Sequence, residues 1–482
     1  MANFKKRQTF SLALSLSLSL LGQPMLTRIE IDGFKTFEGF GLDLGAFVVI
    51  LGPNASGKSN LFDAIRLLSQ LAGTDLRTAV KGLRGEPLEL FRFQADGSSV
   101  TRMAFAVELL LAPEVRDPWG ATVKISHSRV RYEVEIERLK DNRGIERLKV
   151  VKEEAKPLTA DSDRWRTKNQ GISAQFQQLF MKYSCTEKWL TTDSSGGKRI
   201  FKITDGETSR ERSAQAAEAT VLSSITSAEG FPHLYALRSE MRSWRFLQLD
   251  PIALRRPSSV IATDELESDG ANLAGVLARI QAETATAIRP KGDLADIAAD
   301  MTYLIPGVVD VSIQTDNRNL EYNIDISYRD GTRFSSRVVS DGTLRVLALL
   351  TLLYDREHRG LVCFEEPENG IHPIRLKAMI ERLRDLVICP SSEQVDEQEP
   401  LSQILLNSHS PVVLSCLEEE AMFADMVTSI PAMDSSKDPI HPSRKTRIRP
   451  VKSTGELNSQ ENGGEVTRYE VERYLHSYDR EG

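Results

Sequence analysis

"GPNASGKS", residues 52–59, is the most informative segment of the chain for its fold class. It fits the pattern G-x-x-x-x-G-K-[ST] and lies between the apolar run "FVVIL" and an apolar-periodic segment that reaches about residue 71. Between a buried strand and a helix, a loop of this pattern points successive backbone N–H groups at phosphate oxygens. A chance glycine turn would not need these flanks, so the sequence predicts a phosphate-binding P-loop.

The residue types in this loop each have a chemical reason. Gly52 and Gly57 allow a tight turn, and the helix that follows adds partial positive charge at its N-terminus. We expect Lys58 to reach the β- and γ-phosphates of ATP and the Ser59 hydroxyl to ligate Mg²⁺. The predicted nucleotide-binding residues of the loop are Gly52, Asn54, Gly57, Lys58, Ser59 and Asn60.

A second stretch, "VCFEEPENGIHP" at 362–373, ends an apolar run with two adjacent glutamates. Like charges repel, so one interpretation is a strand that runs out into a solvated turn. Beside a P-loop another interpretation is favoured, because nucleotide hydrolysis needs an acid for the metal and a group that orients the attacking water. Glu365 would face Mg²⁺, and Glu366, pointing the other way, would polarise the water.

Two more segments place polar residues at the ends of predicted elements. "VSDGTLR" at 339–345 precedes a helix, so Ser340 is either a simple N-cap or, with Gly342, a further anion site at a helix N-terminus. "NSHSP" at 407–411 ends a strand with His409, which is either a surface histidine or a sensor of the γ-phosphate.

The order of these motifs resembles that of the ABC-type ATPase heads of the RecF, SMC and overcoming-lysogenization-defect (OLD) proteins. It most resembles the stand-alone, RecF-like predicted ATPases of the AAA family, and "GFKTF" at 33–37 and "GKSNL" at 57–61 are similar to this branch too. The resemblance covers residues 26 to about 420. It implies an α/β fold: a P-loop NTPase, with an ABC-type ATPase head and a large α+β insertion between the Walker A and signature motifs.

The resemblance also implies roles for single residues. Lys58 and Ser59 match Walker A, 340–342 the signature, Glu365 and Glu366 Walker B, 369–372 the D-loop, His409 the switch histidine and Gln94 the Q-loop. The implied catalytic residues are Glu366 and His409, the implied metal ligands are Ser59, Glu365 and Gln94, and Ser340 and Gly342 join the nucleotide-binding set.

The chain departs from the pattern of this branch in three places. The signature has SDG where transporters have SGG, and Glu365 replaces the usual Walker B aspartate. No sustained heptad run supplies the long coiled-coil arms of SMC proteins, which excludes a cohesin-like tether.

We expect four parts along the chain. Residues 1–24 form an N-terminal extension, 26–100 and 330–425 the head, 101–329 an inserted α+β lid or arm region, and 426–482 a C-terminal tail. The extension resembles a secretory signal without an A-x-A site, and the favoured alternative is that Met25 is the natural start. The tail, rich in Ser, Pro and charge, is expected to be loosely ordered before a last helix in "EVTRYEVERYLHS".

Composition sets the broad class of the protein. A chain of 482 residues with 40% hydrophobic and 27% charged residues is typical of a globular protein with more than one lobe. A net charge of −7 gives no general support for nucleic-acid binding. Basic residues within 238–257 and 443–450 are either local DNA-binding patches or solvated faces. The four cysteines lack metal-ligand spacing, and we expect a reducing, cytoplasmic location without a membrane.

The resemblance implies an ATP-gated homodimer, because the signature of such heads caps ATP bound to a second copy. One hypothesis is antiphage defence, in which the ATPase controls a separate, nuclease-like effector or acts on DNA. The alternatives are RecF-like DNA repair and a nucleotide-gated scaffold with little turnover, against which Glu366 argues. After His409, "CLEEEAMFADMV" has acids but lacks the glycine–glutamate turn of a TOPRIM domain, and no D-x-D pair follows it, so we do not expect the chain to be a nuclease itself.

Overall fold

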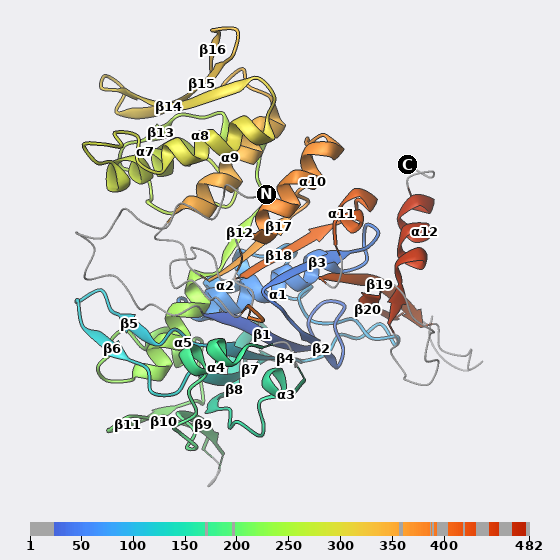
Figure 1. The fold of residues 1–482 in the computed structure, drawn as a ribbon. Helices are drawn as coiled ribbons and strands as arrows, with labels where there is room; N and C mark the ends of the chain where they lie inside the picture. The colour runs from blue at the N-terminus through green and yellow to red at the C-terminus, as the bar shows by residue number, and fades with distance from the viewer. Residues whose placement is uncertain are drawn as a thin grey trace.

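The computed structural model describes residues 24–168, 172–194, 198–355, 360–385, 387, 390–392, 403–417, 420–429, 443–452 and 465–478. The expected N-terminal extension, apart from Pro24, therefore lies outside the described residues. The described part of the chain forms a central sheet, a large antiparallel sheet and two smaller sheets, with helices between and around them (Figure 1).

The central sheet has seven strands and carries the P-loop. In order across the sheet, the strands are β12 (Arg245–Leu247), β17 (Leu361–Glu365), β18 (Gln403–Ser408), β3 (Phe47–Leu51), β19 (Ala421–Ser429), β20 (Ser443–Lys452) and β21 (Val466–Thr467). The first five run parallel, and β20 runs antiparallel to β19. Residues of β3, β17 and β18 are buried throughout, as expected of parallel strands that are covered on both faces.

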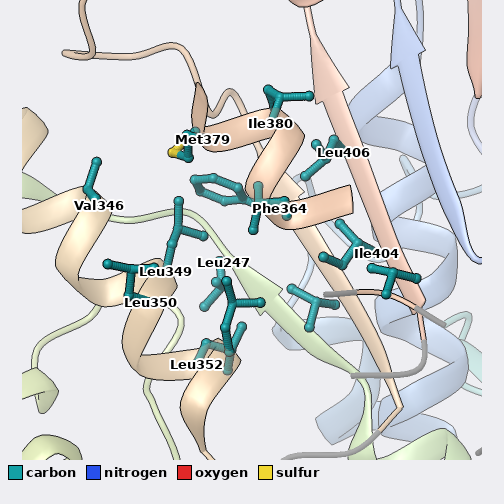
Figure 2. Close-up of a cluster of buried hydrophobic side chains, with 14 of the residues drawn as sticks. Leu247, Val346, Leu349, Leu350, Leu352, Phe364, Met379, Ile380, Ile404 and Leu406 are labelled. Atoms are coloured by element: carbon teal, nitrogen blue, oxygen red, sulfur yellow. The ribbon is translucent and has the colours of Figure 1, made fainter. Parts of the chain in front are cut away.

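Side chains of β3 alternate between two hydrophobic cores: Val49 and Leu51 face one, and Val48 and Ile50 face the other. The first core includes residues of α9 (Asp341–Tyr354), α10 (Pro373–Asp385) and α11 (Pro411–Ser415). Figure 2 shows Phe364 of β17 in this core, between Leu349 on α9 and Met379 and Ile380 on α10.

The second core fills the opposite face of the central sheet. It joins that face to α1 (Lys58–Leu71), α5 (Pro232–Ser243) and the large antiparallel sheet. Because β3, β18 and β17 run parallel, their carboxyl ends lie at the same edge of the central sheet. The P-loop follows β3 there, and Glu365 ends β17 there.

The antiparallel sheet has eight strands. Their order is β11 (Thr208–Ser213), β10 (Ile200–Asp205), β9 (Leu190–Asp193), β8 (Glu146–Pro157), β7 (Arg129–Lys140), β4 (Arg102–Leu110), β1 (Met25–Asp32) and β2 (Phe40–Asp43). β1 pairs with β4, so this sheet contains both residues expected in the head and residues expected in the insertion. The expected division near residue 100 stays a prediction about domains, and it cuts through this sheet.

A third group of elements lies at the top of Figure 1, above the central sheet. It contains α7 (Leu273–Thr284), α8 (Leu294–Leu304) and a small sheet of β13 (Ser258–Ser259), β14 (Val308–Asp316), β15 (Glu321–Tyr328) and β16 (Arg333–Ser335). The remaining elements are α2 (Leu76–Lys81), β5 (Glu114–Arg116), β6 (Thr122–Lys124), α3 (Arg164–Lys168), α4 (Ala174–Phe180), the 3₁₀ turn η2 (Leu222–Ser224), α6 (Pro251–Leu254) and α12 (Arg468–Tyr478). None of the helices described is long and apolar enough to span a bilayer.

The expectation of a loosely ordered tail is wrong for residues 443–452, which form β20 of the central sheet. Thr446 and Ser443 are among the inward-facing residues of this strand, and five basic residues occupy other positions. Small polar residues on the buried face hide the apolar alternation by which a strand is recognised in sequence. Two of the basic residues that were expected as either a DNA-binding patch or a solvated face have partners here: Arg447 and Arg449 pair with Asp425 of β19. The last helix is present as α12.

Candidate nucleotide-binding site

The P-loop joins β3 to α1, and strands from the C-terminal part of the chain support it. Gly57 has a φ of 93°, in the left-handed region that favours glycine. A Cβ on Gly57 would lie 1.9 Å from Oγ1 of Thr446, and a Cβ on Gly52 would lie 2.4 Å from the carbonyl oxygen of Ala424. Both glycines are therefore needed for the close approach of β19 and β20 as well as for the turn.

Lys58 is buried and folds back over its own loop. Its Nζ donates hydrogen bonds to the carbonyl oxygens of Gly52 at 2.5 Å and Pro53 at 2.8 Å. Burial lowers the pKa of Lys58 to about 8, although the carboxylates of Glu366, Glu368 and Glu365 oppose this shift. The loop therefore holds an ammonium group whose charge is poorly solvated and would gain from a nearby anion.

Ser59 and Glu365 meet although 306 positions separate them in the sequence. The Ser59 hydroxyl donates to Oε2 of Glu365 at 3.1 Å. β17 is two strands from β3 in a parallel arrangement, which brings its carboxyl end to the P-loop. A hydroxyl and a carboxylate at this distance are suitable ligands for a hard divalent cation.

Glu366 leaves the strand in a different direction from its neighbour. Its φ is 51°, an uncommon value for a residue with a side chain, and its N–H donates to the carbonyl oxygen of Asn407 at 3.1 Å and to Oδ1 of Asn407 at 3.0 Å. Its Oε2 accepts a hydrogen bond from Nδ2 of Asn369 at 2.7 Å. The two adjacent carboxylates thus have separate partners, Ser59 for Glu365 and Asn369 for Glu366.

Glu368, which sequence reasoning gave no role, holds the histidine loop. Its Oε1 accepts hydrogen bonds from the Ser408 hydroxyl at 2.8 Å and from the His409 N–H at 2.9 Å. Nδ1 of His409 lies 3.1 Å from the same oxygen. The contacts thus join the segment after β17 to the segment after β18. The only sequence signal was the presence of a third acid in "EEPE".

The signature segment begins α9 and packs against the loop that follows Glu366. Ser340 is the N-cap of this helix, and its Oγ accepts from the Thr343 N–H at 3.3 Å. A Cβ on Gly342 would lie 2.3 Å from the carbonyl oxygen of Gly370. The capping interpretation of Ser340 is confirmed, and Gly342 has a packing role within its own chain. Their binding of a nucleotide stays a prediction.

Arg84, which sequence reasoning missed, contacts both halves of the site. Its Nη2 donates to the Ser59 carbonyl oxygen at 2.9 Å and lies 3.4 Å from Oε1 of Glu365. It also pairs with the buried carboxylate of Asp63 on α1, with Nε 3.2 Å from Oδ2. A single arginine in a turn matches no motif by itself, and the flanking glycines in "GLRGEP" were its only signal.

Two predicted ligands, Gln94 and Asn60, have contacts elsewhere, and a third, Asn54, is exposed. Gln94 is exposed and accepts from the Ser98 hydroxyl at 3.0 Å, and within the described residues no hydrogen bond joins it to Ser59 or Glu365. Asn60 donates to Oγ1 of Thr36 at 3.0 Å, and Asn54 is exposed. The predicted roles of these three residues in binding metal or nucleotide stay predictions.

Comparison with curated proteins finds two partial relatives. Structural maintenance of chromosomes protein 1 of Arabidopsis thaliana is 29% identical over 109 residues, which are 21% of this chain and 9% of that protein. Chromosome partition protein Smc of Desulfitobacterium hafniense (strain Y51) is 41% identical over 88 residues, 18% of this chain and 7% of that protein. The matched region spans less than a tenth of either relative.

Solved structures of SMC heads are similar at low sequence identity. An SMC head bound to the C-winged helix domain of ScpA gives a TM-score of 0.46 at 11% identity, covering 88% of this chain and 98% of that chain. The SMC head domain from Thermotoga maritima gives a TM-score of 0.36 at 11% identity, covering 89% and 99%.

A family model matches residues 47–415, which run from β3 through the P-loop, α9 and β17 to the end of α11. The match spans most of the chain and includes the Ser59–Glu365 contact. The predicted fold class is confirmed: an α/β P-loop NTPase of the ABC type, with mixed sheets. The chain belongs to the family described as "AAA domain, putative AbiEii toxin, Type IV TA system".

Proposed function

We propose that this chain binds ATP with Mg²⁺ at the P-loop and hydrolyses the β–γ phosphoanhydride. The observation that carries the proposal is the Ser59–Glu365 hydrogen bond, with Lys58 beside Ser59 and Glu366 beside Glu365. One contact between distant segments thus gathers a phosphate-binding loop, two metal-ligating groups and a hydrolytic carboxylate.

The charges at the site fit a divalent cation together with an anionic ligand. Three carboxylates, those of Glu365, Glu366 and Glu368, act on the buried ammonium of Lys58. Mg²⁺ is usually held through one or two protein oxygens together with nucleotide phosphates. Ser59 and Glu365 would hold it here. When bound, Mg²⁺ would neutralise charge on the phosphate oxygens.

Glu366 is the proposed water-polarising residue. Asn369 and Asn407 support its carboxylate and its backbone, so it needs little reorganisation before it accepts a proton. Lys58 would change its hydrogen bonds from the carbonyl oxygens of Gly52 and Pro53 to phosphate oxygens. His409, fixed by Glu368, would contact the γ-phosphate.

A homodimer is the proposed working state, in which Ser340 and Gly342 contact the nucleotide of a second copy. Large apolar side chains are exposed near this segment: Val338 is 68% exposed, Ile252 of α6 67% and Ile374 of α10 77%. The Arg255 guanidinium, which follows α6, bonds the Val339 carbonyl oxygen at 2.9 Å and the Asp341 carboxylate, so α6 is tied to the signature segment. Exposed apolar groups around a polar motif favour a protein partner at this face.

The proposed biological role is control of a separate effector in antiphage defence. The family description names a toxin and a type IV toxin–antitoxin system, which supports a role in defence over one in DNA repair; the separate effector is part of the proposal. RecF-like DNA repair is the second candidate, supported by the partial similarity to chromosome partition protein Smc. A scaffold with little turnover is the third candidate, and the supported position of Glu366 argues against it. Whether the chain lies in the RecF or the OLD branch is part of the proposal.

Hydrolysis by purified protein tests the proposed activity. Wild type should release phosphate from MgATP, and Lys58→Ala should lose ATP binding. Glu366→Gln should bind normally but turn over on the order of a hundredfold or more slowly, since general-base groups contribute about 10²–10⁴-fold. An ATP-bound dimer of Glu366→Gln in light scattering would support the homodimer. Equal turnover of wild type and Glu366→Gln would contradict the assigned role.

A separate experiment distinguishes an effector partner from a nuclease activity of the chain itself. Plasmid DNA incubated with the protein, ATP and Mg²⁺ or Mn²⁺ should remain uncut. Deleting the expected tail, residues 426–482, would not show whether the tail carries a nuclease. The deletion would also remove β20, which contacts the P-loop. Cutting by Glu366→Gln as well as by wild type would contradict the proposal that any nuclease is a separate chain.

A further inference from the structure

Thr446 of β20 touches the P-loop from outside the segment that the family model matches. It is 1% exposed, and its Oγ1 lies 3.3 Å from the carbonyl oxygen of Ser56 and 2.6 Å from Oγ1 of Thr36. Thr36 in turn accepts from Nδ2 of Asn60 on α1 at 3.0 Å. The Thr446 hydroxyl, which comes from the C-terminal part of the protein, thus belongs to a series of polar contacts around the P-loop.

The donors in this chain of contacts can be assigned by counting protons. The Ser56 carbonyl can only accept, so the single proton of the Thr446 hydroxyl points to it. The proton between the two threonines must then come from Thr36. Thr36 has no further proton and can accept from the amide of Asn60. The four groups form one directed relay from Asn60 through Thr36 and Thr446 to the Ser56 carbonyl.

The end of the relay fixes one peptide plane. The peptide between Ser56 and Gly57 is planar and trans, since none of the described peptide bonds is cis, so its C=O and N–H point in opposite directions. A carbonyl held toward Thr446 turns the Gly57 N–H away from β20. Among the described residues this N–H forms no hydrogen bond, and it directly precedes Lys58 in the loop.

The backbone of Gly57 and the side chain of Thr446 are in close contact, and there is room for no side chain on residue 57. Gly57 lies so close to Thr446 that an added Cβ would be 1.9 Å from Oγ1 and 2.9 Å from Cβ of the threonine. Thr446 is also fixed through its backbone, since its N–H donates to the Thr36 carbonyl oxygen at 2.9 Å and it pairs with Met426 of β19. Contacts with Thr36 and with β19 therefore hold the Thr446 hydroxyl against the P-loop.

We propose that Thr446 is a positioning residue of the nucleotide site: through the Ser56 carbonyl it holds the Gly57 N–H toward the phosphates of a bound nucleotide. The inference rests on the proposed ATP-binding function and deepens it. Under this proposal β20 contributes to nucleotide binding, although the strand lies beyond the last predicted motif, "NSHSP" at 407–411.

Thr446→Val tests the proposal, because valine keeps the shape and removes the hydroxyl. The Kd for MgADP and the KM for MgATP should rise about five- to tenfold, the effect of one hydrogen bond on affinity, while kcat changes less than about twofold. Thr446→Ser should restore wild-type values. Thr428→Val, which alters an exposed threonine of the neighbouring strand, is the matched control and should change neither constant.

The outcomes separate this inference from the function on which it rests. If wild type does not bind MgADP in calorimetry, the proposed function fails. If wild type binds and Thr446→Val binds equally well, only the positioning role of Thr446 fails. Should Thr446→Val melt at a much lower temperature than wild type, Thr446→Ala removes the same hydroxyl with a smaller side chain. Unchanged affinity in a folded Thr446→Ala protein would then overturn the proposal.

Discussion

The guanidinium of Arg84 lies 3.4 Å from the carboxylate of Glu365, at the side of the site where Glu365 also accepts from Ser59. Arg84 thus places positive charge beside Glu365. Half of the Arg84 side chain is exposed, so solvent weakens this pair, but its bonds to Ser59 and Asp63 hold it in place.

Replacing Arg84 should make nucleotide binding depend more strongly on metal. In Arg84→Ala, Glu365 would face the phosphates without a compensating cation unless Mg²⁺ is present. We expect ATP affinity in EDTA to fall about fivefold or more, and affinity with excess Mg²⁺ to fall less, by calorimetry; a single hydrogen bond to a charged group contributes about 1.5–3 kcal/mol. Arg77→Ala, on α2, is the control. Equal losses with and without Mg²⁺ would contradict this charge-balancing role.

The lowered pKa of Lys58 predicts proton uptake when ATP binds. Burial holds this pKa at about 8 in the free chain, and phosphate anions would raise it, so binding near pH 8 should take up a proton. ATP affinity should therefore fall from pH 7 to pH 9. Calorimetry in two buffers with different ionisation enthalpies measures the uptake, and Lys58→Arg, which does not titrate here, should show none.

The lowered pKa of Lys58 also predicts how the free energy of unfolding changes with pH. The folded-state pKa of Lys58 lies below the unfolded value of about 10.4, so the unfolded chain holds more protons between about pH 8 and pH 10. The contribution of this group to the free energy of unfolding should rise with pH across that window, and the buried charge should lower stability below it. Loss of this rise in Lys58→Met, measured by urea unfolding, would confirm the cause.

Gly342→Ala should disturb the loop that carries Glu366. The added Cβ would lie 2.3 Å from the Gly370 carbonyl oxygen, which is backbone and cannot rotate away. We expect a loss of stability of about 1–3 kcal/mol and a lower kcat in the same chain. Gly230→Ala is the control, because no atom lies within 4 Å of its added Cβ. Wild-type stability and turnover in Gly342→Ala would show that the contact yields easily.

Mixed subunits test the proposed homodimer. Lys58→Ala lacks a working P-loop, and Ser340→Arg blocks the signature, so each variant alone should be inactive. In a heterodimer of the two, one composite site pairs an intact P-loop with an intact signature, and partial ATP hydrolysis should return. Absence of activity in a purified, differently tagged heterodimer would mean that each site is complete within one chain.

Sequence patterns predict those elements whose signals are local. The P-loop between "FVVIL" and α1, the buried strand ending at Glu365, and the cap at Ser340 each depend on residues that are adjacent in the chain. Glycine spacing, apolar runs and capping residues act over a few positions, so pattern reasoning finds them. The pairing of residues 129–157 as a hairpin around "DNRG" is predictable for the same reason.

Which distant groups meet follows from the packing of the folded chain and not from any local pattern. Arg84 contacts Glu365, and Thr446 contacts the P-loop, because the order of strands in the central sheet places β17 and β20 on either side of the P-loop strand β3. No periodicity encodes that order, since it is set by packing both faces of the sheet against separate cores. Thr446 in particular is a small polar residue in a basic segment. Only in the folded chain is it buried and in contact with the Ser56 carbonyl oxygen of the P-loop.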